Sequence, residues 1–108
     1  MSKASRDKGK RGERSAKALL IARDYTILAD TTAGLSTDDL VVQSPGGEIL
    51  SVEVKNCKLI NIPVFVKQAK TNAKKNHYLL MCHISGTSAW LIMGSNRVPV
   101  IWHQNTEV

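Results

Sequence analysis

The sequence has few cysteines and no long apolar run, and both absences limit what the protein can be. Cys57 and Cys82 form neither a CxxC pair nor another spacing typical of zinc ligands, so we expect thiols in a reducing compartment and no structural disulfide. No segment approaches the roughly 20 apolar residues that span a bilayer, and no apolar signal segment follows the basic N-terminal residues. We therefore expect no membrane association and a cytoplasmic location in a bacterial, archaeal or phage-infected host cell.

Internal repeats, low-complexity tracts and interdomain linkers are also missing from the sequence. A chain of 108 residues with 43% hydrophobic content is long enough to bury a single core. Residues 1–9 are polar and basic, and have no means of burying apolar surface. We expect them to form a flexible basic arm, and residues 10–108 to form one domain.

One long segment of the chain has no basic residues, and the segment that follows it has no acidic residues. Residues 24–54 contain six acidic side chains and no basic one, whereas residues 55–75 contain six lysines and no acid. Residues 1–23 are strongly basic, and the net charge of the chain is +6. This distribution, in which acids lie between two basic segments, favours a polyanionic partner such as nucleic acid.

The pattern of apolar residues predicts two helices, each followed by several strands. An apolar stripe predicts a helix from about Arg11 to Arg23, and Pro63 suits the first turn of a helix that reaches about Lys75. Pro99 places the last strand at a sheet edge. Runs rich in β-forming residues predict strands at 25–28, 39–43, 48–56, 77–84, 88–93 and 98–102. This order predicts an α/β or α+β domain with a mixed sheet.

The stretch from Ser36 to Lys55 predicts a β-hairpin that carries reactive side chains. Because strand side chains alternate between faces, Glu53 and Lys55 lie on one face and Val54 on the other. Asp39 begins the neighbouring strand. A carboxylate and an ammonium side by side, next to a second carboxylate, can bind a hard divalent cation and position a water molecule.

Glu13 is the upstream candidate for the same site. It continues, by one turn, the apolar helix stripe that includes Ala16 and Leu20, so its side chain is aimed toward the sheet. The alternative is that Glu13 only complements the positive end of the helix dipole. The triplet of Glu53, Val54 and Lys55 does not by itself indicate a function either, because an E-x-K motif is short enough to arise by chance.

Four short motifs taken together resemble the PD-(D/E)XK nuclease superfamily, and within it the small Holliday-junction resolvases of archaea and phages. These motifs are GERSAKALL, STDDLVV, SVEVKN and FVKQA, which together span roughly residues 9–75. The resemblance implies a restriction-endonuclease-like fold, in which helices flank a mixed central β-sheet. It also implies hydrolysis of DNA to 5′-phosphate and 3′-hydroxyl ends.

The resemblance also implies roles for individual residues. Catalysis is expected from Glu13, Asp39, Glu53 and Lys55. A Mg²⁺ ion, for which Mn²⁺ would substitute, is expected to be held by Asp39, Glu53, the Val54 carbonyl and Glu13. Asp38 stands where the family motif has proline, which leaves Asp38 as an alternative ligand to Asp39. Gln68 in the second helix is an expected accessory residue, with an ordinary surface amide as the alternative.

The basic residues around this centre are the expected contacts for DNA phosphates. They are Lys10, Arg11, Arg14, Lys58, Lys67, Lys70 and Lys74. The expected function is paired cleavage of branched double-stranded DNA by a homodimer, whose interface is expected at residues 59–63 and 98–102. The alternatives are a PD-(D/E)XK nuclease that acts on other DNA, in restriction or repair, and a basic nucleic-acid-binding module without catalysis.

Overall fold

The computed structural model describes residues 3–29, 40–56, 58, 61–73, 76–95 and 97–104, with side chains described from residue 12 onward. Within these residues, a helix followed by three strands occurs twice. The elements are α1 (Lys3–Ala22), β1 (Thr26–Ala29), β2 (Leu40–Gln43), β3 (Ile49–Lys55), α2 (Ile62–Ala73), β4 (His77–His83), β5 (Ala89–Gly94) and β6 (Val100–His103). Each strand and helix expected from the sequence is present, with ends shifted by at most about two residues except at the start of α1.

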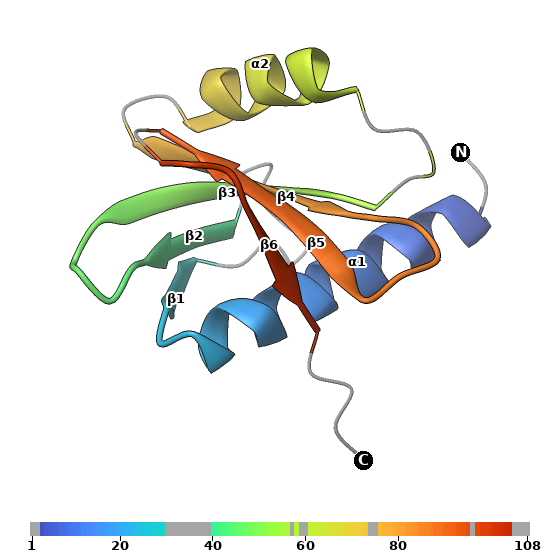
Figure 1. Cartoon of the computed structure of the whole chain (residues 1–108), viewed down its shortest axis with the longest axis horizontal. Helices are drawn as coiled ribbons and strands as arrows, with labels where there is room; N and C mark the ends of the chain where they lie inside the picture. The colour runs from blue at the N-terminus through green and yellow to red at the C-terminus, as the bar shows by residue number, and fades with distance from the viewer. Residues whose placement is uncertain are drawn as a thin grey trace.

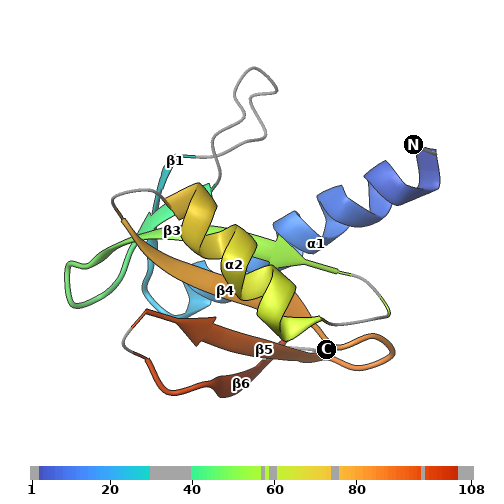
Figure 2. The ribbon, with the colours of Figure 1, turned by 90° about the horizontal axis from the view of Figure 1, so that it is seen from above.

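The strands form one mixed sheet in the order β1-β2-β3-β4-β5-β6. The β3–β4 pair is parallel, and the other neighbouring strands are antiparallel. Helix α2 provides the crossover between the two parallel strands and covers one face of the sheet, whereas α1 lies beneath the other face (Figures 1 and 2). The expectation of a mixed β-sheet flanked by helices is confirmed. Strand β6 lies at an edge, with Pro99 just before it, as the sequence predicts.

The core is built on both faces of the sheet. On the α1 side, Leu20 packs with residues such as Leu50, Val52 and Trp90 in one buried cluster. On the α2 side, the small residues Ala69 and Ala73 are buried. Strand β4 crosses between the two helices, and its four consecutive buried residues from 79 to 82 reflect burial on both faces rather than alternation.

Helix α1 differs from the prediction at its start and has a distinct end. It begins at Lys3 rather than near Arg11, so the backbone from residue 3 to residue 9, which we expected as part of an arm, continues the helix. Lys, Ala and Arg are good helix formers, and the packed second half of the helix supplies a nucleus from which helix propagates. At the other end, Asp24 adopts a left-handed φ of 67°. The Asp24 amide donates to the Ile21 carbonyl and the Tyr25 amide to the Leu20 carbonyl, which is the Schellman pattern.

The β2–β3 hairpin has the turn that the sequence predicts. The Gly47 amide donates to the Ser44 carbonyl at 2.9 Å, and the Ser44 amide donates to the Glu48 carbonyl at 2.8 Å. Gly47 has a φ of 93°, a conformation that glycine adopts without the steric cost of a side chain. In the two strands that this turn connects, Leu40 pairs with Val52 at the end of the described ladder that is farthest from the turn. This register fixes which face each β3 side chain occupies.

Candidate active site

Strand β3 presents one polar face and one apolar face, as the alternation predicts. Leu50 and Val52 belong to the buried core, and Val54 packs against it. On the opposite face, the Lys55 Nζ lies 3.3 Å from the Glu53 Oε2, in an ion pair whose side chains are only 24% and 15% exposed. The structure therefore brings Glu53 and Lys55 together at a partly desolvated position near the carboxyl end of a strand in the middle of the sheet.

Helix α2 lies over this polar face and supplies further partners. The Asn72 side-chain amide donates a hydrogen bond to the Glu53 Oε1 at 3.0 Å. The Lys55 ammonium lies 5.1 Å from the centroid of the Phe65 ring, within the range of a cation–π contact. Just after the helix, the Asn76 amide donates to the hydroxyl of the buried Ser51 at 3.2 Å. The polar face of β3 is thus matched, side chain by side chain, to one face of α2.

Helix α1 approaches the same end of β3 from the other side of the sheet. A Cβ atom placed on Gly12 would lie 2.9 Å from the Asn56 Cβ, so only glycine permits this approach without a shift. Asn56 follows Lys55 directly, and its Oδ1 lies 2.9 Å from the His83 Nδ1 at the end of β4. Glu13, next to Gly12, is half-buried and has an interaction of its own. Helix α1 packs on the face of β3 that carries Leu50 and Val52, opposite the face that carries Glu53 and Lys55, so the role of Glu13 as a ligand stays a prediction.

The other predicted ligands and accessory residues have different outcomes. Asp38 and Asp39 lie outside the described residues. Gln68 is exposed, one helical turn before Asn72 on the same side of α2, so its accessory role remains a prediction. Within the described residues, no group of three or more His, Cys, Asp or Glu side chains is placed to hold a metal ion.

The predicted phosphate-binding residues that the structure describes are all at the surface. Arg14, Lys58, Lys67 and Lys70 are exposed. The side chains of Lys10 and Arg11 are not among those described, and Lys74 lies outside the described residues. Exposure is required of a residue that binds phosphate, but a merely solvated surface has it as well.

The donors present at the β3 site fit a hard divalent cation. They are a carboxylate and a backbone carbonyl, and Mg²⁺ takes oxygen ligands of these kinds. However, the Lys55 ammonium lies 3.3 Å from the Glu53 Oε2 and competes with a cation for this oxygen. One carboxylate does not make a complete site, so a cation here would need the further carboxylates that the sequence predicts.

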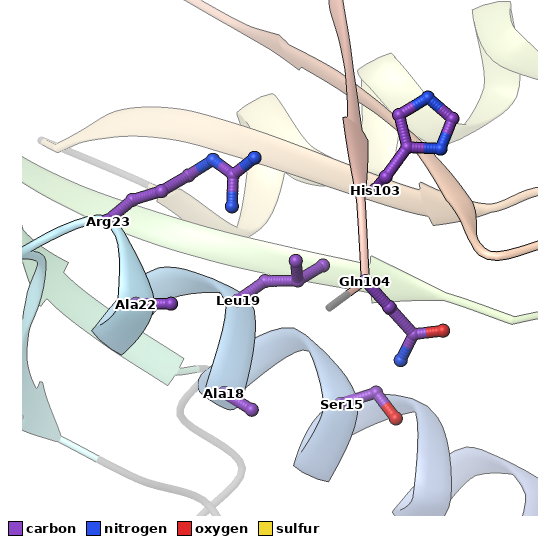
Figure 3. A pocket seen from close by; sticks show the side chains of 7 residues that line it. All are labelled: Ser15, Ala18, Leu19, Ala22, Arg23, His103 and Gln104. Carbon is purple, nitrogen blue, oxygen red and sulfur yellow. The ribbon is translucent and has the colours of Figure 1, made fainter. Parts of the chain in front are cut away.

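A groove of about 150 Å³ lies elsewhere on the molecule, between α1 and the end of β6 (Figure 3). Ala18 and Ala22 leave space on the helix, because their side chains are short and stand one turn apart. The residues around the groove are Ser15, Ala18, Leu19, Ala22, Arg23, His103 and Gln104. Of the predicted catalytic residues that the structure describes, Glu13, Glu53 and Lys55, none lines this groove.

Sequence analysis missed the asparagines of this site. Asn72 contacts a strand residue 19 positions earlier in the chain, and no local pattern indicates such a contact. One signal was present: Gln68 and Asn72 are amides four residues apart, which places them on one side of the second helix. Both amides are exposed, and of the two Asn72 contacts the sheet, through Glu53.

Comparisons of the chain with protein-family models, with curated proteins and with solved structures give no match. The function is therefore inferred from the residues and contacts of this chain. In the ranges that the structure describes, no helix is long and apolar enough to cross a membrane.

Proposed function

We propose that the protein is a divalent-metal-dependent DNA endonuclease of the PD-(D/E)XK type, which resolves four-way junctions. The observation that carries the proposal is the Glu53–Lys55 ion pair, 3.3 Å across and largely removed from solvent, on the polar face of a central strand. An acid and a lysine two residues apart on one strand are the pair that the E-x-K motif requires. The mixed sheet, with α1 before three antiparallel strands and α2 before a parallel fourth, agrees with a restriction-endonuclease-like fold.

The register of the β2–β3 ladder supports Asp39 rather than Asp38 as the second acid. The last described pair is Leu40 with Val52. If the ladder continued by one residue, Asp39 would stand opposite Glu53 and share its face, because directly paired residues of antiparallel strands point to the same side. Asp38 would then point to the opposite face. The proposed ligands are therefore Asp39, Glu53 and the Val54 carbonyl. Glu13, on the helix at the opposite face of the sheet, is proposed as a further ligand from the family resemblance alone.

Lys55 is the residue that we assign to the attacking water. Its ammonium is held by Glu53 on one side and by the Phe65 ring on another, which limits the positions that the flexible side chain can take. From there the Lys55 ammonium orients the water and offsets charge that grows on the phosphoryl oxygens. To deprotonate the water, Lys55 would first have to lose its own proton. A bound Mg²⁺ would supply Lewis-acid polarisation of the phosphate and a lowered pKa of a bound water.

Branched DNA and a homodimer complete the proposal. The exposed basic residues Arg14, Lys58, Lys67 and Lys70 suit contacts to phosphates, which depend little on sequence. Resolution of a four-way junction requires two cuts on opposed strands, and a two-fold dimer supplies two sites. Val98, Val100 and Ile101 are exposed apolar residues in and beside the edge strand β6, where the sequence suggested an interface.

The dimer is tested by a charged substitution at this edge. Ile101 is 47% exposed, so Ile101→Lys is expected to leave the fold intact while it disrupts an apolar interface. Light scattering after size-exclusion chromatography should show a dimer for the wild type and a monomer for the variant. Leu28→Lys, at an exposed position on the other edge strand, is the matched control. A wild type that is monomeric at all concentrations contradicts this part of the proposal.

The activity is tested by offering the protein a four-way junction, a linear duplex and a single strand, each with Mg²⁺, Mn²⁺ or EDTA. We expect symmetric nicking of the junction alone, only when metal is present. Glu53→Gln should abolish cleavage but preserve binding of the DNA junction, because the amide has the shape of the carboxylate without its charge. Cleavage by this variant at the wild-type rate would contradict the assignment of Glu53 to a metal site.

A non-catalytic DNA-binding module is the second candidate, and the ion pair itself is the observation in its favour. Glu53 and Lys55 neutralise each other, as oppositely charged neighbours on a strand often do. In that case the protein retards all three DNA substrates and cuts none of them in any metal. Cleavage of the linear duplex favours instead a restriction or repair nuclease.

A further inference from the structure

The two oxygens of the Glu53 carboxylate are held by different partners. Oε1 accepts a hydrogen bond from the Asn72 side-chain amide at 3.0 Å, and Oε2 lies 3.3 Å from the Lys55 Nζ. The Glu53 side chain is only 15% exposed, so few water molecules compete for these oxygens. The two partners together fix the rotation of the carboxylate plane.

The position of Asn72 is itself determined by the packing of α2. Ala69 and Ala73 are 2% and 4% exposed, and these small residues let the helix lie close to the sheet. A short asparagine side chain at position 72 then spans the remaining distance to Glu53. The contact between Asn76 and Ser51 holds the same end of the helix in register with β3. Asn72 is itself exposed, so its donor is oriented by the packing of α2 and by the hydrogen bond to Glu53 rather than by burial.

An oriented donor on one oxygen affects which cations the carboxylate favours. A cation that takes both oxygens of Glu53 competes with the hydrogen bond from Asn72, whereas a cation that takes only Oε2 leaves it in place. Ca²⁺ binds carboxylates through one or both oxygens with flexible geometry. Mg²⁺ requires near-ideal octahedral geometry at shorter distances and keeps several water ligands, which suits single-oxygen ligation.

We propose, on the basis of the metal site in the proposed function, that Asn72 is a positioning residue that restricts Glu53 to single-oxygen ligation and thereby selects Mg²⁺ over Ca²⁺. Asn72 acts through Glu53 and does not itself bind the metal. Partners that orient a ligand in this way typically change metal affinity by about 10- to 100-fold when they are removed. The selectivity resides in one hydrogen bond between α2 and β3.

The test is a binding measurement that needs no DNA and no turnover. MgCl2 and CaCl2 are titrated separately into ¹⁵N-labelled protein, and the backbone amide shifts of Val54 and Lys55 give a Kd for each metal. In Asn72→Ala we expect the Mg²⁺ Kd to rise by about tenfold while the Ca²⁺ Kd is unchanged or lower. The ratio of the two Kd values then moves about tenfold toward Ca²⁺.

Two further variants keep the outcome interpretable. Asn76→Ala is the matched control, because it removes the same amide from the same side of the β3 polar face but breaks a bond to Ser51 instead of Glu53. It should leave the ratio unchanged. Asn72→Leu keeps the side-chain volume without the donor and should reproduce Asn72→Ala.

Each alternative outcome has a distinct meaning. An unchanged ratio in both Asn72 variants, whether neither Kd changes or both rise alike, overturns the assigned selectivity and leaves the metal site standing. If neither metal shifts the β3 amides of the wild-type protein, the proposed metal site fails and the role of Asn72 fails with it. If Asn76→Ala changes the ratio as strongly as Asn72→Ala, the effect comes from displacement of α2 rather than from the bond to Glu53, which also overturns the inference.

Discussion

Gly12 of α1 lies so close to Asn56 at the end of β3 that a Cβ on the glycine would come within 2.9 Å of the Asn56 Cβ and 3.1 Å of its Nδ2. This contact connects the first helix to the residue that follows Lys55. The glycine in the GERS motif therefore has a packing role that is independent of any chemistry at the site.

Gly12→Ala is accordingly expected to destabilise the protein. Overpacking of this kind costs about 1–3 kcal/mol, whereas alanine is favoured over glycine in a helix by only about 1 kcal/mol. Thermal unfolding followed by circular dichroism should show a lower Tm. In the Asn56→Gly background, where the opposing Cβ is absent, the same substitution should cost less or stabilise the protein. Equal losses in both backgrounds would mean that this contact is not the cause.

Asp24 is a site where a single substitution should stabilise the fold. Its φ of 67° at the end of α1 lies in the left-handed region, which is costly for a residue with a Cβ. Asp24→Gly removes that cost and also removes a negative charge beside the negative end of the helix dipole. We expect a gain of about 1 kcal/mol, equivalent to a Tm increase of roughly 4–8 °C. Asp24→Ala is the control and should be less stable than Asp24→Gly; the reverse order contradicts this explanation.

Much of the fold is predictable from local patterns in the sequence. Alternation along β3 correctly divides Glu53 and Lys55 from Val52 and Val54, because residues of one strand are separated by a fixed geometry. Turn residues at 44–47 correctly locate the hairpin. Such features depend only on neighbours in the chain.

The features that escaped prediction depend on packing between distant segments. The bond from Asn72 to Glu53 exists because α2 crosses the sheet at a particular height, which the buried alanines determine. The early start of α1 at Lys3 was missed because the apolar stripe, which locates the packed part of a helix, does not mark how far the helix extends beyond it. The packing of distant segments therefore decides which polar side chains surround Glu53 and Lys55.

The exposed lysines of α2 predict a measurable dependence of DNA affinity on salt. Each lysine that contacts a phosphate contributes about one unit to the slope of log Kd against log salt concentration. The double substitution Lys67→Gln and Lys70→Gln should lower this slope by about two units and weaken binding to all DNA sequences alike. Thr71→Ala, an exposed change on the same helix without loss of charge, is the control. An unchanged slope means that this face of α2 is only solvated surface.

Lys55→Met separates the roles of the two members of the ion pair. Methionine keeps most of the apolar stem against Phe65 but removes the ammonium that lies 3.3 Å from the Glu53 Oε2. We expect junction cleavage to fall by about 10²- to 10³-fold, as when a single charge-stabilising donor is lost from an active site. Mg²⁺ affinity should stay the same or increase, because a competing positive charge next to Glu53 has been removed. Glu53→Gln should instead lose both cleavage and Mg²⁺ binding. If Lys55→Met cleaves at the wild-type rate, Lys55 only neutralises Glu53, and the water must be activated by another group.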